Sequence, residues 1–152
     1  MYGRSKLLGE LQDSEGLTLR TSIVGPEVGT SHGLFEWFLT NTDPQVRGFT
    51  NAIFSGLTTL ELSRVVASVI QGGPHLSGVY QVSADSISKY DLLMLLKDAF
   101  AIKKEVRPVP LPIIDRSLDS SKFKQATGYS APPWQIMVRE LAEDMRASKV
   151  CG

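Results

Sequence analysis

Short β-branched segments alternate with amphipathic helical segments along this chain, and this order restricts most strongly the folds open to it. Residues 17–24 and 79–83 are rich in Leu, Val, Ile and Thr, which predicts strands. Residues 58–70 and 88–100 carry apolar side chains three or four positions apart, typical of helices with one buried face. Strand, helix, strand and helix in turn predict an α/β fold with a βαβ-type sheet.

Helix boundaries are also marked in the sequence. Thr58 followed by Glu61 is a capping box, and Gly72-Gly73-Pro74 ends the helix that it opens. The apolar stripe of this helix is expected to lie in the core, and its members are Leu62, Val65, Val66, Val69 and Ile70. Ser88 is expected to cap the next helix, and Pro132-Pro133 to start the last one.

For three further segments the sequence predicts a range of end points or two alternative structures. The helix that begins at Tyr2 is expected to end between Asp13 and Gly16. Residues 46–55 are predicted to be a short extended segment or a hairpin around Asn51. Residues 106–112 hold three prolines and are expected to be extended, at a sheet edge or off the sheet.

The composition excludes several classes of protein. The chain has 152 residues, which suits one domain, and its sixteen basic and sixteen acidic residues argue against a nucleic-acid or anionic-membrane surface. It has no apolar run of the roughly 18 residues that a membrane span requires. His32, His75 and Cys151 are too few and too scattered to predict a metal site, and the single cysteine favours a cytoplasmic location.

Tyr2 and Lys6 are the first candidate catalytic pair. Residues four apart lie on the same face of a helix. A free phenol has a pKa of about 10, and a nearby ammonium lowers that pKa, so the tyrosine can exchange a proton with a substrate oxygen near neutral pH. The pattern alone equally suits an ordinary surface helix with a Lys6–Glu10 ion pair.

Gly25, Gly29 and Gly33 lie between a predicted strand and a predicted helix. Their spacing is not the Gly-x-Gly-x-x-Gly of a dinucleotide loop, and Pro26 removes a backbone donor, so a phosphate cradle is not predicted here. Thr21 and Ser22 are expected at the carboxyl end of a strand, where open α/β sheets bind ligands, or as residues that only complete strand-end hydrogen bonds.

Six segments in order resemble the extended short-chain dehydrogenase/reductase family, also called the NAD-dependent epimerase/dehydratase family. The closest branch is that of the dTDP-4-dehydrorhamnose reductase-like sugar-nucleotide reductases. The segments that carry the resemblance are Tyr2–Glu10, Leu19–Gly25, Arg47–Phe49, Phe54–Thr59, Gly78–Ser83 and Ser117–Phe123.

The resemblance implies the C-terminal half of a Rossmann-type parallel-sheet fold with a small mixed α/β substrate-binding part. Residues 1–152 would then hold the catalytic helix, the last sheet strands and the substrate-binding region. The N-terminal dinucleotide-binding half, with its glycine-rich loop and catalytic Ser or Thr, is expected to be absent. The isolated chain is therefore expected to be inactive and to bind NAD or NADP incompletely.

The resemblance also implies roles for particular residues. Tyr2 would be the proton donor, and Lys6 would lower its pKa and hold the nicotinamide ribose. Further cofactor contacts would come from Thr21, Ser22 and Ile23, which follow the strand.

Three further residues are expected to contact substrate. Asp115 and Arg116 would face the phosphate or base of a nucleotide sugar, and His32 would contact substrate from the glycine-containing loop. The alternatives are a surface ion pair or helix cap for the first two and an ordinary exposed loop residue for His32.

The implied function is that of a fragment of an NAD(P)-dependent oxidoreductase acting on a nucleotide-linked 4-keto sugar. Two alternatives remain: sugar-nucleotide epimerase or dehydratase chemistry on the same scaffold, and a non-catalytic regulatory or interaction subunit. The expected partners are the nucleotide-sugar substrate and the missing N-terminal half or a second copy of the chain, with neither nucleic acid nor membrane.

Overall fold

The computed structural model describes residues 2–10, 16–29 and 32–150 of the chain. The helices are α1 (Tyr2–Leu8), α2 (Leu34–Thr40), α3 (Thr59–Ile70), α4 (Lys89–Ala99), α5 (Ser121–Thr127) and α6 (Trp134–Val150). The strands are β1 (Leu17–Arg20), β2 (Ile23–Val24), β3 (Gln45–Phe49), β4 (Ala52–Phe54), β5 (Leu57–Thr58), β6 (Gly78–Gln81), β7 (Ile87–Ser88), β8 (Glu105–Val109) and β9 (Ile114–Arg116).

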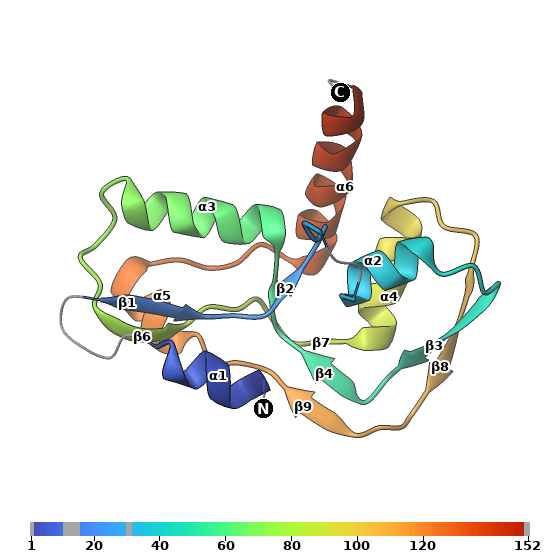
Figure 1. The fold of residues 1–152 in the computed structure, drawn as a ribbon, viewed down its shortest axis with the longest axis horizontal. Helices are drawn as coiled ribbons and strands as arrows, with labels where there is room; N and C mark the ends of the chain where they lie inside the picture. The colour runs from blue at the N-terminus through green and yellow to red at the C-terminus, as the bar shows by residue number, and fades with distance from the viewer. Residues whose placement is uncertain (1, 11–15, 30–31, 151–152) are drawn as a thin grey trace.

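The strands form small, mainly parallel sheets. β1 pairs with β6, β2 with β5 and β3 with β8, each in parallel, and Figure 1 shows the β1–β6 and β3–β8 pairs at opposite ends of the molecule. β4 lies between β7, its antiparallel neighbour, and β9, its parallel neighbour. The predicted α/β class with parallel pairing is confirmed.

The β1–β6 pair divides at its carboxyl end, and we call this point the fork. Val82 N–H donates to Arg20 O, and this is the last hydrogen bond between the two chains. Beyond it, each chain bonds to the segment that contains Gly56 and Leu57. Leu57 N–H donates to Ser22 O on one side, and Ala84 N–H donates to Gly56 O on the other. Residues 56–58 therefore lie between the two diverging chains, and the predicted strand over 17–24 is interrupted at Thr21 and Ser22.

α6 joins the two ends of the molecule. It packs against α3, α4 and β5, and Figure 1 shows it rising between α3 and α4. Its buried side chains share the core with aromatic and aliphatic residues from the other elements. The core includes Phe35, Phe38, Leu57, Val82, Leu92, Leu93, Leu96, Phe123, Met137 and Leu141.

Both predicted helix caps are present. Thr58 Oγ1 accepts a hydrogen bond from Glu61 N–H, and Ser88 Oγ accepts one from Asp91 N–H. The apolar stripe of α3 is less buried than predicted, because Val65 is buried whereas Ile70 is 77% exposed and Val66 is also exposed. Only one side of this stripe meets the rest of the described chain.

One local prediction is wrong. α1 ends at Leu8 and not between Asp13 and Gly16, because Gly9 is a poor helix former and Glu10 turns toward β1. Of the two outcomes left open for residues 46–55, the structure has extended segments with a turn near Asn51. β3 and β4 do not form a hairpin, because each pairs with a strand distant in sequence. The prediction of an edge segment at 106–112 is confirmed for β8, whose only strand partner among the described residues is β3.

A buried carboxylate on α3 lies at the centre of a polar network that reaches Tyr129, after α5, and Glu140 on α6. Glu61 of α3 is 5% exposed, and its Oε1 accepts a hydrogen bond of 2.9 Å from the Tyr129 hydroxyl. Arg64 lies 3.2 Å from Glu61 Oε2 and also bonds to Glu140 of α6. Burial, together with the hydrogen bond to Glu61, raises the pKa of Tyr129.

We predict that Gly56→Ala destabilises the fold by about 1–3 kcal/mol, because a Cβ at this position meets atoms that cannot easily move. It would lie 2.2 Å from Ser22 O and 2.3 Å from the ring of Phe54. Urea unfolding measures the change. Gln125→Ala, an exposed change on α5, is the control and is expected to shift the free energy by less than about 0.5 kcal/mol. Equal stability of both variants would contradict the role given to Gly56.

We predict that Tyr129→Phe lowers the free energy of unfolding at pH 7 by about 1.5–3 kcal/mol, because Glu61 loses a donor in a buried position. The folded pKa of Tyr129 is raised, so the unfolded chain releases this proton first as the pH rises past about 10. The stabilisation is therefore present below that pH and is lost above it.

Urea unfolding of the wild type and of Tyr129→Phe at pH 7 and at pH 11 checks this sign, and the difference between them is expected to shrink at pH 11. Tyr90→Phe is the control, because the Tyr90 hydroxyl forms no hydrogen bond with the described residues. A difference that grows with pH would contradict the assignment.

Candidate functional site

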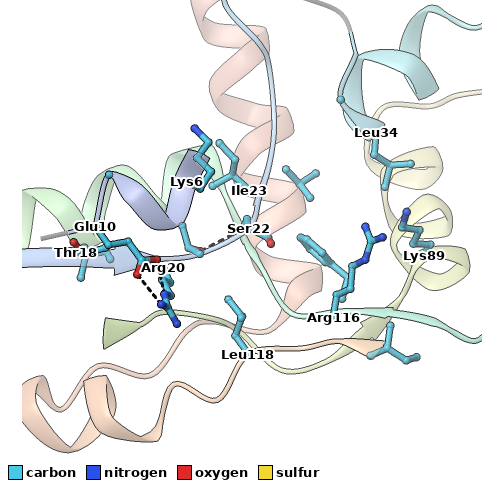
Figure 2. Close-up of a pocket in the computed structure, with 17 residues that line it drawn as sticks. Lys6, Glu10, Thr18, Arg20, Ser22, Ile23, Leu34, Lys89, Arg116 and Leu118 are labelled. Carbon is cyan, nitrogen blue, oxygen red and sulfur yellow. Dashed lines mark hydrogen bonds and ion pairs between the residues drawn. The ribbon is translucent and has the colours of Figure 1, made fainter. Parts of the chain in front are cut away.

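A cavity of about 790 Å³ opens beside the fork. Its walls come from elements far apart in the sequence, and Figure 2 shows them around one hollow. The lining residues are Lys6, Gly9, Glu10, Thr18, Leu19, Arg20, Thr21, Ser22, Ile23, Val24, Gly33, Leu34, Ile53, Phe54, Lys89, Arg116 and Leu118. A cavity of this size suits a small organic ligand, since such sites typically measure roughly 300–1,000 Å³.

The charges in this lining are mostly positive. Lys6, Arg20, Lys89 and Arg116 contribute cations, and Glu10 is the one carboxylate among the described lining residues. Arg20 holds Glu10 with two hydrogen bonds, from Nε to Oε1 and from Nη2 to Oε2, each 2.6 Å long. This bidentate pair joins the end of α1 to β1. The hydrogen bonds from Arg20 lower the pKa of Glu10.

Thr21 and Ser22 form the part of the wall that lies at the fork. Ser22 O accepts the Leu57 N–H, and the Thr21 hydroxyl donates to the same oxygen over 3.2 Å. Neither residue belongs to a strand, because the chain changes partner here from β6 to β5. Ile23 follows with an exposed side chain, so the wall offers hydroxyl groups and apolar surface together.

Two buried serines position the opposite wall. Ser55 Oγ accepts a 2.7 Å hydrogen bond from Leu118 N–H, and Ser83 Oγ donates one of 3.0 Å to Leu118 O. Ser55 is 1% exposed and Ser83 5% exposed, so both bonds are shielded from water. They hold the backbone that follows β9 against the fork, and thereby fix Arg116 at the cavity.

The cavity brings together five of the residues predicted from the sequence. Lys6 reaches it from α1, while Thr21, Ser22 and Ile23 line it at the fork and Arg116 lines it at the end of β9.

The other predicted site residues lie elsewhere. Tyr2 begins α1, but its side chain lies outside the described residues. His32 is exposed and is not part of the lining, and its backbone N–H donates a hydrogen bond to the Glu27 carboxylate. Asp115 is also outside the lining, and its Oδ1 accepts the Ser117 N–H, which lowers the pKa of this carboxyl group. The substrate contacts predicted for His32 and Asp115 stay predictions.

Sequence reasoning missed the remaining charged and aromatic lining residues. Lys89 reaches the cavity from the start of α4, and Phe54 from β4. No local pattern distinguishes Lys89 from other helix lysines, because its place depends on the pairing of β7 with β4. The sequence did contain a signal for the Glu10–Arg20 ion pair. These two oppositely charged residues lie on either side of the segment that links the first helix to the first strand.

Two features are absent from the described residues. None of the helices in residues 2–10, 16–29 and 32–150 is long and apolar enough to cross a membrane. In the same ranges, His, Cys, Asp and Glu side chains form no group of three or more able to hold a metal ion.

Several solved structures of nucleotide-sugar enzymes are similar to this chain in fold. A dTDP-4-dehydrorhamnose reductase from Bacillus anthracis, solved in complex with NADP, matches 94% of this chain and 52% of its own with a TM-score of 0.70 and 17% identity. A hypothetical dTDP-4-dehydrorhamnose reductase from Sulfolobus tokodaii matches 88% of this chain and 51% of its own, with a TM-score of 0.63 and 26% identity. UDP-glucose 4-epimerase from Thermotoga maritima, solved with UDP-glucose, matches 88% and 46%, with a TM-score of 0.65 and 17% identity.

The chain has the fold of these Rossmann-like reductases and epimerases. The predicted resemblance is thus confirmed at the level of the fold. The chain spans about half the length of the solved structures that it matches. No protein-family model and no curated protein sequence matches it.

We predict that Arg20→Gln raises the pKa of Glu10 back toward 4.5, because the hydrogen bonds and the charge of Arg20 hold it below that value. The pair contributes stability above the unfolded pKa of this carboxyl group, and that contribution is lost as the pH falls through the lowered folded pKa. Carboxyl ¹³C NMR titration measures the midpoint. Arg139→Gln, an exposed change on α6, is expected to leave it unchanged. An unmoved midpoint in Arg20→Gln would contradict the bidentate pair.

Proposed function

We propose that this chain is the catalytic-helix and substrate-binding half of an NAD(P)-dependent oxidoreductase of the dTDP-4-dehydrorhamnose reductase type, acting on a nucleotide-linked 4-keto sugar. One observation carries the proposal. Lys6 of α1, the hydroxyl groups of Thr21 and Ser22 at the fork, and Arg116 of β9 line one cavity in a fold shared with such reductases. These residues come from three separate parts of the sequence.

The lining fits a nicotinamide nucleotide in its donor set. Lys6 supplies an ammonium group suited to ribose hydroxyls, and Thr21 and Ser22 supply further polar groups beside the apolar surface of Ile23. When bound, such a cofactor supplies or accepts the hydride, and the protein supplies orientation and electrostatics.

Tyr2 is the proton donor in this proposal. Its role rests on its place at the start of α1, one helical turn before Lys6. The ammonium of Lys6 favours the phenolate form and so lowers the pKa of the phenol toward the working pH. The proton then passes between the Tyr2 hydroxyl and the substrate oxygen.

The complete site requires a dinucleotide-binding half in addition to these residues. The support for this is that the chain spans about half the length of the structures it matches, and that Leu7 and Leu8 of α1 are exposed, Leu8 to 87%. Large apolar side chains on a helix usually face a partner surface. The 152 residues alone are accordingly expected to be inactive.

A second candidate function is that of a non-catalytic interaction subunit. The observation that favours it is the exposed apolar edge of α3, formed by Val66 and Ile70. A subunit that binds another protein through this edge would need no cofactor.

We predict that NADPH or NADH binds only when this chain is mixed with a separately expressed dinucleotide-binding half of a related reductase. Nicotinamide fluorescence titration measures the binding, with circular dichroism to show that the chain is folded. Lys6→Met is expected to weaken cofactor binding and to lower turnover of a dTDP-linked 4-keto sugar by roughly 10²–10⁴-fold. Lys103→Met, an exposed lysine away from the cavity, is the control.

Three outcomes are informative. Turnover by the isolated chain would contradict the need for a second half. Interconversion of UDP-sugars without net oxidation would favour the epimerase alternative. Absence of cofactor binding in a folded mixture would overturn the oxidoreductase proposal and favour the interaction subunit.

A further inference from the structure

The helix that brings Lys6 to the cavity buries little of its own surface. The α1 side chains whose burial is described, those of Arg4, Lys6, Leu7 and Leu8, are all exposed. In contrast, each of the helices α2 to α6 buries at least one apolar side chain. A helix of seven residues is also too short to be stable through its backbone hydrogen bonds alone. The position of α1 must therefore depend on contacts other than a buried apolar face.

Glu10 supplies such a contact at the end of α1. The Gly9 and Glu10 N–H groups donate to Lys6 O and Leu7 O over 3.2 and 3.3 Å, so the chain continues for one tighter helical turn beyond Leu8. Glu10 follows Lys6 by four residues and thus lies near the same face of the helix. Whatever holds Glu10 also fixes the rotation of α1 about its axis, and with it the direction from which Lys6 enters the cavity.

Arg20 holds Glu10 from the sheet. Arg20 is the last residue of β1, and its backbone O accepts the Val82 N–H immediately before the fork. The guanidinium group is therefore attached to backbone whose place the sheet determines. Figure 2 shows its two hydrogen bonds to Glu10 as dashed lines, with Lys6 and Ser22 drawn among the same lining residues. The ion pair links the helix that carries Lys6 to the strand that ends at the fork.

The geometry of this pair distinguishes it from an ordinary surface ion pair. Most exposed pairs contribute little, because water screens their charges and two long side chains lose rotational freedom. Here the Glu10 side chain is only 11% exposed, and the Arg20 side chain is 41% exposed. Two parallel hydrogen bonds of 2.6 Å join the groups, and a bidentate contact fixes orientation as well as distance. Arg20 is thus suited to hold α1 in one place.

We propose that Arg20 is a positioning residue, which acts through Glu10 to hold α1 where Lys6 lines the cavity beside the fork. Loss of the pair frees α1 to rotate and move, and Lys6 then leaves its place in the lining. The consequence for cofactor binding rests on the proposed function, in which Lys6 holds the nicotinamide ribose. The placement of Lys6 is a property of this chain alone.

Backbone ¹⁵N relaxation of the isolated 152-residue chain tests the placement without any ligand. We expect the order parameters of residues 6–9 to be near 0.85 in the wild type, and to fall below about 0.6 in Arg20→Gln and in Glu10→Gln. The reversed pair, Glu10→Arg with Arg20→Glu, is expected to recover the wild-type values. Arg64→Gln is the matched control, because it breaks the pair between α3 and α6 and leaves α1 untouched.

A double-mutant cycle tests the consequence for the site. NADPH titration of the chain mixed with a dinucleotide-binding half compares the wild type, Arg20→Gln, Lys6→Met and the double variant, each shown by circular dichroism to be folded. We expect Arg20→Gln to weaken binding by roughly tenfold and to have no further effect when Lys6 is already Met, because both changes remove the same contact. A role in stability alone would make the two losses multiply.

Several results would overturn the positioning role. These are unchanged order parameters in Arg20→Gln, an equal fall in Arg64→Gln, no recovery in the folded reversed pair, or independent losses in the cycle.

The two experiments also separate this inference from the proposed function. If the wild-type mixture binds no nicotinamide nucleotide, the oxidoreductase proposal fails, and the order parameters of the isolated chain alone decide whether Arg20 positions α1. If the mixture binds NADPH equally well with Arg20→Gln, the oxidoreductase proposal stands and the positioning role fails.

Discussion

Insertion of residues 56–58 between two parallel strands is the constraint on which this structure depends. The Leu57 N–H to Ser22 O and Ala84 N–H to Gly56 O bonds keep the backbone satisfied where β1 and β6 separate. Only glycine fits at position 56, since a side chain there would meet Ser22 O and the Phe54 ring. The cavity exists because the strands part at this point, and polar backbone and hydroxyl groups reach its wall instead of pairing within one continuous sheet.

The second wall is built by tertiary pairing. Ser55 and Ser83 hold the backbone of Leu118 through buried hydrogen bonds, while β4 sets the register of β7 and β9. Buried hydrogen bonds are costly to break because the freed groups find no water. The position of Arg116 therefore depends on the same polar contacts that join the fork to the three-stranded sheet.

Local signals in the sequence predicted the elements well and their pairing poorly. Thr58 and Ser88 marked two helix starts because a capping hydroxyl acts within one turn. The partners of β3 and β4 depend on strands about 35 to 60 residues away, and no short pattern encodes them. The family resemblance supplied Lys6, Thr21, Ser22, Ile23 and Arg116 as candidates, and all five line the cavity. Lys89 and Phe54 were found only once the sheet was known, because their places at the cavity depend on strand pairing.

The distribution of charge in this molecule also bears on how a ligand arrives. The chain carries as many acidic as basic residues, yet cations dominate one cavity lining. Acidic residues must then outnumber basic residues over the rest of the molecule. Charge is therefore unevenly distributed over a chain whose formal net charge is zero. At physiological ionic strength such a field extends only about 8 Å from its source. The cavity therefore attracts a small anion at close range and reorients it on approach, while distant polyanions experience a neutral particle.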